Sequence, residues 1–402
     1  MPPILPTDSP LGAHLEGIPV PHADILLVAD MLCDDERAKL QEIHEFLQTE
    51  IRPVVGEYWD REEFPFDLLP LLAEHGLGEI ELSDTSRLFR GLVYAEVTRA
   101  DVSFSTLVGI HNELVIGVIN GMGSDAQREK WLPGLRRFEK VGCFALTEPD
   151  HGSDVAGGLA TSAQRTDDGW VINGKKRWIG GGTFADFTIV FARDTEDHTV
   201  KAFLVENDRE GVRTSKISGK LALRIMQNAD MTFDNVEIPA ENIIEGVKSF
   251  ADLNTYLCTS RAWVAWQGAG LQLGIFDKAR EYALKREQFG RPLAKFQLVQ
   301  ESLARILGNA SASLGMMAHI AQLQERGLLD MPKAAMAKAT TTRLARESAA
   351  VGRALAGGNG ILTEYDLSKM MADAEALYTY EGTYDINSLI VGRAVTGHSA
   401  FV

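Results

Sequence analysis

The sequence predicts an α+β fold with an N-terminal helical domain, a middle β-sandwich or barrel-like domain and a C-terminal four-helix bundle. Apolar residues recur with a helical period up to about residue 140 and again after about residue 248. Between these regions they alternate or form short apolar runs, as strands do. We therefore expect an N-terminal arm over residues 1–29 and domains over residues 30–140, 141–248 and 249–402.

Helices account for the first domain. The stretch "DDERAKLQEIHEFLQTEIRPVV" has its apolar residues on one helical face: Leu40, Ile43, Phe46 and Leu47. We expect Pro53 to end this helix, because proline lacks the backbone N–H that a helix interior needs. The stretch "HNELVIGVINGMGSDAQREKWLPGLRRFE" predicts two more helices around Gly121–Gly123.

Strands account for the middle domain. In "GWVINGKKRWI", two short runs are joined by Asn173-Gly174, which predicts a β-hairpin. The runs "FTIVFARD", "KAFLVEN" and "MTFDNVEIP" have strand length and apolar content, and Pro239 closes the last of them.

Long helices return after residue 250. One has an apolar stripe of Leu271, Ile275, Ala279 and Tyr282, and Gly290 and Pro292 are its stop signals. Two more long helices follow, the second with Pro332 near its start and Gly357 at its end. Short links between long helices predict a bundle.

The final helix follows "YEGTYD". Thr383 is its expected N-cap. Its expected buried face consists of Ile386, Leu389 and Ile390.

Composition narrows the class of function. A net charge of −16 argues against nucleic acid as the partner, because phosphate binding needs a basic face. The three cysteines are far apart and no histidine pair has metal-ligand spacing, so we expect neither a disulfide framework nor a metal site. We find no secretory signal and no run that approaches transmembrane length, so we expect no membrane association.

Several strings suit a ligand, although each also has a purely structural interpretation. "CFALTEPDHGSD" offers small and hydroxyl residues to an anionic or ring-shaped ligand, or it is a capped polar loop. Trp178 in "KKRWIGGG" either covers a planar cofactor or is a core residue before a turn. In "KREQFGRP", Arg286 and Phe289 either hold a phosphate and stack, or lie at a solvated helix end. Gly357 and Gly358 in "AGGNGI" also suit a helix end.

Glu381 is an acidic residue in an otherwise apolar stretch. A carboxylate in the apolar and aromatic stretch "LYTYEGTYDINSL" is costly unless it is paired or used. The alternative is an ordinary helix start at Thr383.

Taken in order, "CFALTEP…GSD", "K.WI", "LR…FD.V.IP", "R.QFG.PL..FQ", "GGNGI" and "YEGTYDI" resemble the acyl-CoA dehydrogenase and oxidase superfamily. The resemblance runs from about Asp30 to Phe401. The strings "KRWIGGGTFAD", "ALRIMQNAD" and "YEGTYDIN" look like those of short-chain acyl-CoA oxidases of plant peroxisomes, and glutaryl-CoA dehydrogenases are also similar.

The resemblance implies an FAD-dependent enzyme that converts a straight short-to-medium-chain acyl-CoA into a trans-2-enoyl-CoA. Glu381 then matches the base that removes the α-proton, and its backbone N–H matches a donor to the thioester oxygen. The positions that match flavin contacts are Phe144, Leu146, Thr147, Gly152, Ser153, Trp178, Ile179, Gly180, Arg286, Phe289, Gln297, Gly357, Gly358, Thr383 and Phe401. The positions that match substrate contacts are Ser105, Ser153, Ser260, Arg261 and Gly382.

In related enzymes, residues such as Arg286, Phe289, Gln297 and the Gly357–Gly358 segment reach the FAD of a neighbouring subunit, which implies a homotetramer. Some relatives carry the base one position before Arg261, where this chain has Ser260, and serine cannot replace it.

Departures from the family pattern leave alternatives open. Gly180 stands where dehydrogenases have a threonine near flavin N5, which leans toward an oxidase that uses O₂ rather than an electron-transfer flavoprotein. Ser105 stands where glutaryl-CoA dehydrogenases have an arginine, which favours a monocarboxylic acyl chain. Ala354 removes a polar cofactor contact.

A further alternative is a binding protein that has lost its chemistry, although the retained Glu381 argues against it. The ending "HSAFV" lacks a peroxisomal address, so we expect a bacterial cytoplasmic protein.

Overall fold

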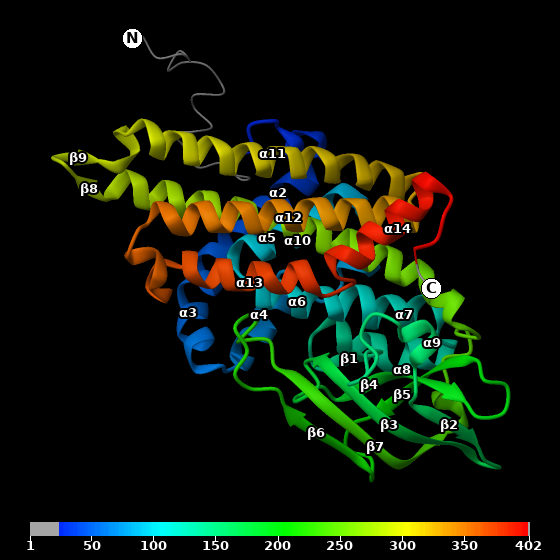
Figure 1. Ribbon diagram of the computed structural model, residues 1–402. Coiled ribbons are helices and arrows are strands. Elements are labelled where there is room, and N and C mark those ends of the chain that lie inside the picture. Colours follow the sequence, from blue (N-terminus) through cyan, green and yellow to red (C-terminus); the bar gives the residue numbers. More distant parts are fainter. Residues whose placement is uncertain (1–23, 401–402) are drawn as a thin grey trace. The chain divides into compact units, whose positions relative to one another are not determined.

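A computed structural model of the chain describes residues 24–400 (Figure 1). These residues form two compact units, and each combines segments that are distant in the sequence. Unit 1 consists of the described part of residues 1–60, residues 84–105 and residues 261–400. Unit 2 consists of residues 61–83 and 106–260. Most of the predicted N-terminal arm lies outside the described residues, and the predicted domain boundaries stay predictions.

Unit 1 is helical. Its long C-terminal helices form a bundle in which neighbours run in opposite directions (Figure 1): α10 (Asn254–Lys285), α11 (Gln297–Glu325), α12 (Met331–Leu355) and α13 (Leu367–Thr379). The shorter elements of its C-terminal part are β8 (Glu287–Gln288), β9 (Arg291–Pro292), η8 (Leu293–Lys295), η9 (Asn359–Ile361), η10 (Thr363–Tyr365) and α14 (Tyr384–Thr396). Its N-terminal elements are η1 (Val28–Met31), α2 (Asp34–Phe46), η2 (Leu47–Ile51), α3 (Arg52–Arg61) and α5 (Arg87–Ala100), and the helix α6 (Val102–Gly109) begins in this unit.

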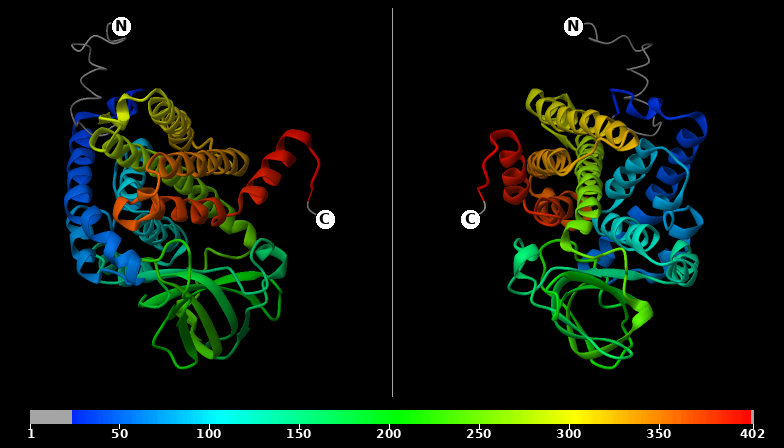
Figure 2. Two further views of the ribbon diagram at one scale, coloured as in Figure 1. Left: turned by 60° about the vertical axis from the view of Figure 1, so that its left-hand side comes forward. Right: turned by 90° about the vertical axis from the view of Figure 1, so that its right-hand side faces the viewer.

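Unit 2 contains a curled sheet, which Figure 2 shows nearly end-on. Among the described residues it has seven strands in the order β1-β4-β2-β3-β7-β6, with β5 paired to β4. The strands are β1 (Gly142–Ala145), β2 (Ser162–Arg165), β3 (Gly169–Gly180), β4 (Phe187–Asp194), β5 (Val200–Glu206), β6 (Val212–Lys216) and β7 (Asn228–Pro239). Its helical elements are η3 (Phe66–Leu68), α4 (Leu69–Glu74), η4 (Ile80–Leu82), η5 (Ile110–Ile116), α7 (Gly117–Met122), α8 (Asp125–Arg136), α9 (Val155–Gly158), η6 (Ala240–Asn242) and η7 (Phe250–Leu253).

The central strand β4 explains the apolar run "FTIVFARD". Ile189 and Phe191 pack into one hydrophobic cluster, whereas Val190 and Ala192 pack into another on the opposite face. A strand that is buried on both faces needs apolar residues throughout. The predicted helical, β and helical regions are confirmed.

The predicted hairpin at Asn173-Gly174 is wrong. Both halves pair with the same neighbour, β7, so β3 is one strand, and its register shifts between Ile172 and Gly174. Gly174 has φ of 156°, and a Cβ there would lie 2.4 Å from Thr161 Oγ1. The glycine therefore serves a β-bulge, which needs the same conformational freedom as a turn.

Pro53 does not end its helix, contrary to prediction. The chain stays helical from α2 through η2 and α3 to Arg61. η2 is a π-helical turn in which the Arg52 N–H donates to the Leu47 carbonyl. This wider turn accommodates the proline that follows, where a regular α-helix would be disrupted.

The expectation that no run approaches transmembrane length is also wrong. Residues Val102–Met122 form a 21-residue helical stretch with a mean hydropathy of 1.5. Burial of 89% of its most apolar window within the protein accounts for this composition, because core helices are apolar on every side.

The last helix, α14, projects from the side of the bundle (Figure 2). Thr383 Oγ1 accepts a hydrogen bond from the Ile386 N–H at 3.2 Å, so the predicted N-cap is confirmed. The predicted buried face is wrong, because Ile386, Leu389 and Ile390 are only partly buried and Asn387 is the buried residue of the described helix.

Close packing of α5 against α10 predicts an effect on stability. A Cβ on Gly270 would lie 2.1 Å from the Ala95 carbonyl oxygen, which belongs to the backbone and cannot rotate away. We expect Gly270→Ala to lower the free energy of unfolding in urea by about 1–3 kcal/mol. Gly308→Ala on α11 is the matched control, because no atom lies within 4 Å of its Cβ position. The control should stabilise the protein by about 0.5–1 kcal/mol. Equal effects of the two changes would contradict the packing argument.

Candidate active site

The link between α13 and α14 carries Glu381 in an unusual backbone conformation. Glu381 has φ of 53° and Gly382 has φ of 86°, so both lie in the left-handed region. Glycine adopts this region freely, whereas a glutamate pays a steric cost of about 1 kcal/mol or more. Such a conformation persists only where the surroundings enforce it.

Lys338 on α12 is hydrogen-bonded to the backbone of this turn. Its side chain is fully buried. Nζ donates hydrogen bonds to the Tyr378 carbonyl at 3.0 Å and to the Gly382 carbonyl at 2.7 Å. The last carbonyl groups of a helix lack partners within the helix, so the ammonium group satisfies one of them at the end of α13. The two bonds tie together the residues on either side of Glu381.

Two further contacts fix the same turn. Asn387 Nδ2 donates to the Gly382 carbonyl at 2.8 Å and to the Thr383 carbonyl at 3.1 Å. The Tyr380 hydroxyl donates to Gln267 Oε1 on α10 at 2.5 Å. The turn is therefore anchored to α10, α12 and α14.

The surroundings of Glu381 are ionic rather than purely apolar. The sequence places Glu381 in an apolar and aromatic stretch, whereas the residue is only partly buried in the structure. The guanidinium of Arg261 lies against the turn, since a Cβ on Gly382 would be 3.5 Å from Arg261 Nη2. Burial lowers the pKa of Lys338 to about 7, Glu381 acts to raise this pKa, and Arg261 lowers it further. A carboxylate and two cationic groups thus interact electrostatically at this turn.

The predicted substrate residues differ in their surroundings. Ser105 is fully buried, and its hydroxyl lies 2.6 Å from Thr98 Oγ1 and accepts a hydrogen bond from Gln267 Nε2 at 2.9 Å. Gln267 also binds Tyr380, so a chain of polar groups links Ser105 to the turn. Ser260 is also fully buried, and its hydroxyl donates to the Leu257 carbonyl in its own helix.

Another set of predicted cofactor residues lies at the opposite end of the bundle (Figure 1). It consists of Arg286, Phe289, Gln297, Gly357 and Gly358. The 13-residue helix α13 separates this end from Glu381 by roughly 20 Å or more. The structure therefore does not bring these residues to Glu381 within one chain. Phe401 lies outside the described residues.

Phe289 marks the tip of the hairpin between β8 and β9. Its side chain is 92% exposed and its φ is 53°, and Gly290 follows with φ of 75°. Two consecutive left-handed residues form the tight turn of a two-residue hairpin. The hairpin thus presents an aromatic ring to the outside of the chain.

In unit 2, the segment after β1 is bonded to the strand that carries Trp178. Lys176 Nζ donates to the Leu146 carbonyl at 3.1 Å and forms an ion pair with Glu148 at 2.9 Å. The Arg177 N–H donates to the Thr147 carbonyl at 2.9 Å. Two predicted flavin segments are therefore brought together.

Trp178 lies exposed at a break in the regular pairing of its strand. Its φ of 67° coincides with a register shift between Lys176 and Ile179, and its side chain is 52% exposed. A bulge re-aims a side chain out of a sheet, and a strained, exposed tryptophan is an uncommon feature of a purely structural strand. Ile179, by contrast, is buried in the sheet core.

The loop beside this strand adds groups that suit FAD. Gly152 and Ser153 are exposed, Thr147 is partly exposed, and no atom lies within 4 Å of a Cβ position on Gly152. Phe144 is partly buried, and its ring lies 4.7 Å from the ring of Phe191. Exposed hydroxyl and backbone groups beside an aromatic ring fit a ligand with a ring system and phosphates.

Gly180 has little room for a side chain. A Cβ there would lie 2.7 Å from Ile110 Cδ1 and 3.0 Å from Met226 Cε. The space that a threonine would occupy is thus filled by two apolar side-chain ends, which would have to move.

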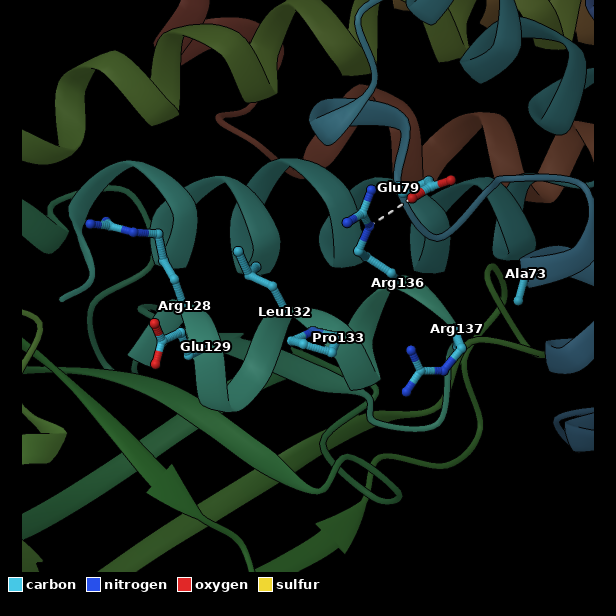
Figure 3. A pocket seen from close by; sticks show the side chains of 8 residues that line it. All are labelled: Ala73, Glu79, Arg128, Glu129, Leu132, Pro133, Arg136 and Arg137. Atoms are coloured by element: carbon cyan, nitrogen blue, oxygen red, sulfur yellow. Dashed lines mark hydrogen bonds and ion pairs between the residues drawn. The ribbon is translucent and has the colours of Figure 1, made fainter. Parts of the chain in front are cut away.

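An open depression of about 540 Å³ on unit 2 is unrelated to these residues (Figure 3). Its arginines are neutralised by carboxylates, as in the 2.7 Å ion pair between Arg136 and Glu79. Its lining consists of Ala73, Glu79, Arg128, Glu129, Leu132, Pro133, Arg136 and Arg137. Within residues 24–400, no group of three or more His, Cys, Asp or Glu side chains is arranged to hold a metal ion.

Comparison with protein families identifies the fold. The N-terminal, middle and C-terminal domain models of acyl-CoA dehydrogenase match residues 33–139, 143–236 and 250–396. The chain belongs to the acyl-CoA dehydrogenase family. It is therefore an FAD-dependent oxidoreductase, and the predicted superfamily, fold and cofactor are confirmed.

Relatives share about a third of their residues with this family member. An acyl-CoA dehydrogenase of Bacillus subtilis is 31% identical over 366 residues, which cover 88% of this chain and 96% of the relative. A short-chain specific acyl-CoA dehydrogenase of Clostridium acetobutylicum is 30% identical with the same coverage.

Solved structures agree with this assignment. A glutaryl-CoA dehydrogenase of Mycobacterium smegmatis is 32% identical with a TM-score of 0.90, and the match covers 94% of this chain and 99% of that one. A glutaryl-CoA dehydrogenase from the same organism, in complex with FADH₂, is 29% identical with a TM-score of 0.91, covering 97% and 100%. Butyryl-CoA dehydrogenase of Megasphaera elsdenii is 29% identical with a TM-score of 0.85, covering 90% and 98%.

The sequence analysis missed Lys338, although a signal was available. Lys338 lies on the apolar stripe of an alanine-rich helix with Ala334, Thr341 and Ala345, all of which are buried. Lysine is rarely buried without a specific partner. A lysine in such a stripe therefore indicates a polar group opposite it.

The low pKa of Lys338 predicts that stability depends on pH. Burial lowers this pKa from the ordinary 10.5 to about 7, so between these values the unfolded chain binds the proton more tightly. The free energy of unfolding should therefore rise with pH across this interval, by at most about 1.4 kcal/mol per pH unit. Urea unfolding of wild type and Lys338→Met between pH 7 and 10 checks it. The rise attributable to this group should be absent in the variant, and a difference independent of pH would contradict the assignment.

Proposed function

We propose that this enzyme oxidises a straight short-to-medium-chain acyl-CoA thioester to a trans-2-enoyl-CoA, with Glu381 as the base that removes the α-proton. The observation that carries the proposal is the turn at Glu381. A glutamate held in a left-handed conformation by three surrounding elements is fixed for a purpose other than packing.

The chemistry explains why a fixed carboxylate is needed. The α-proton of a thioester is a very weak acid, so the base must be close and well oriented. Removal of the proton places negative charge on the thioester oxygen, which the Glu381 backbone N–H is proposed to bind. Lys338 interacts electrostatically with Glu381, so a cationic group lies near the carboxylate that would take the proton.

The cofactor residues are proposed on the same basis. Phe144, Leu146, Thr147, Gly152 and Ser153 would hold FAD together with Trp178, Ile179 and Gly180, and Thr383 would add a contact. Bound FAD supplies the acceptor for the hydride from the β-carbon. The hairpin at Phe289 and the segment at Gly357 would serve another subunit, since they lie roughly 20 Å or more from Glu381.

The acyl group is proposed to be uncharged at its far end. Ser105 contributes a hydroxyl that is already bonded to Thr98 and Gln267, and a distal carboxylate would require a cationic partner. The short-chain specific and butyryl-CoA relatives support this substrate class. Glutaryl-CoA is the alternative that the Mycobacterium smegmatis relatives favour.

The electron acceptor, the oligomeric state and the cellular location are also proposed. An electron-transfer flavoprotein is the proposed acceptor, because the relatives described above are dehydrogenases. O₂ is the alternative that Gly180 favours. We also propose a homotetramer, supported by the 92% exposure of Phe289, and a cytoplasmic location.

Glu381→Gln tests the base. The amide has nearly the same size but cannot accept the α-proton, so we expect kcat on butyryl-CoA to fall by about 10³-fold or more while FAD content stays unchanged. Glu375→Gln on α13 is the matched control, because Glu375 pairs with Arg346 and is also partly exposed. Retained activity in Glu381→Gln would place the base elsewhere.

An acyl-CoA panel tests substrate and acceptor together. We expect C4–C12 saturated thioesters to reduce an artificial acceptor, and glutaryl-CoA to be a poor substrate for lack of an arginine at position 105. Peroxide release under air at a comparable rate would establish the oxidase alternative instead. Release of labelled CO₂ from glutaryl-CoA would establish the glutaryl-CoA alternative.

A further inference from the structure

Lys338 differs from the other deeply buried lysines of the described residues in what it binds. Lys369 forms ion pairs with Asp101 and Asp373, and Lys176 forms one with Glu148. The two hydrogen-bond acceptors of Lys338 are both uncharged backbone carbonyls. These carbonyls belong to Tyr378 and Gly382, which lie three residues before and one residue after Glu381.

We propose that Lys338 is a positioning residue of this active site: its bonds to the Tyr378 and Gly382 carbonyls fix the turn that aims Glu381, and its charge stabilises the ionised carboxylate. The second part of this inference depends on the proposed role of Glu381 as the base. The first part depends on the geometry of the turn alone.

The hydrogen bonds explain how the turn keeps its strained conformation. Without them, the carbonyl at the end of α13 and the Gly382 carbonyl would each lose the buried ammonium group as a donor, and an unmade hydrogen bond in a protein interior is costly. Tyr380 and Asn387 hold the turn from other sides, but neither binds the Tyr378 carbonyl. A single atom, Lys338 Nζ, therefore links a backbone carbonyl before Glu381 to one after it.

The charged groups around Lys338 determine how it acts on Glu381. Glu381 faces it from the link between α13 and α14, and Arg261 faces it from α10. Tyr378 of α13 stacks on Tyr384 of α14, with ring centroids 5.1 Å apart. Burial lowers the pKa of Lys338 to about 7, so its charge changes near neutral pH. A neutral amine keeps two N–H donors. Deprotonation therefore removes the charge of Lys338 but leaves its hydrogen bonds to the Tyr378 and Gly382 carbonyls in place.

Three variants separate these contributions. Lys338→Met removes both the donors and the charge, and Lys338→Gln keeps N–H donors without the charge. Thr342→Val is the matched control. Thr342 is buried on the same helix, one turn after Lys338, and its hydroxyl donates to the Lys338 backbone carbonyl rather than to the Glu381 turn. Thermal unfolding and FAD content establish that each variant is folded.

The first measurement is amide hydrogen–deuterium exchange in peptides that cover residues 378–387, which needs no turnover. We expect exchange to accelerate about tenfold in Lys338→Met and to stay near wild type in Lys338→Gln and Thr342→Val. Unchanged exchange in Lys338→Met would refute the proposal that the hydrogen bonds of Lys338 fix the turn. If Lys338→Met does not fold, Lys338→Gln and its pH profile still test the effect of the charge.

The second measurement is the pH dependence of kcat on an acyl-CoA that the wild type oxidises. We expect Lys338→Met to lower kcat by about 10- to 100-fold with little change in KM, because a misplaced base slows the proton transfer rather than binding. The acid limb of the profile should move to higher pH in both Lys338→Met and Lys338→Gln, since the negatively charged carboxylate loses a nearby cation. An unmoved acid limb in a folded Lys338→Gln would overturn the role of the charge.

The two measurements also separate this inference from the proposed function. A wild type that oxidises no acyl-CoA would refute the function, while the exchange data would still decide whether Lys338 fixes the turn. A wild type that turns over normally, alongside a Lys338→Met variant that matches it in both rate and exchange, would refute only the inference.

Discussion

The buried ammonium group of Lys338 is the contact on which the geometry of Glu381 depends. A lysine in the interior of a helical bundle loses its hydration, and this loss has to be offset by hydrogen bonds. The carbonyls at the end of α13 and at Gly382 provide them, and in return they are held at fixed positions. Glu381 lies between these two carbonyls, so its left-handed conformation follows from the same pair of bonds. Tyr380 and Asn387 then restrict the remaining freedom of the turn.

The three buried lysines show how partners decide the charge of a buried group. Burial disfavours the charged form of Lys369, but Asp101 and Asp373 outweigh this effect and raise its pKa above the ordinary range. Burial lowers the pKa of Lys176 to about 8 although Glu148 opposes it. For Lys338, which binds only uncharged carbonyls, burial lowers the pKa to about 7. The lysine beside the proposed base is thus the one whose charge is most easily changed near neutral pH.

Among the ten non-glycine residues with a positive φ in the described part of the chain, three lie where the family resemblance predicts function. Trp178, Phe289 and Glu381 are bulky residues with a positive φ, and each lies at a break in regular structure: a bulge, a hairpin tip and a helix link. Sterically costly conformations survive where neighbouring elements enforce them. Rigid strands and long helices do so here, which explains how single side chains can be held out of the regular packing.

The sequence alone determined the order of helical and β regions, the N-cap at Thr383 and the family, because these depend on local periodicity and on rare strings along the chain. It did not determine that Asn173-Gly174 is a bulge rather than a hairpin, or that the helix continues past Pro53. Those outcomes depend on which strand pairs with β3 and on the π-turn before Arg52. The role of Lys338 also required the tertiary structure, because its partners lie 40 and 44 residues further along the chain. Local sequence determines which secondary structure a segment prefers. Contacts between distant segments decide which groups share a buried space, and therefore which groups surround Glu381.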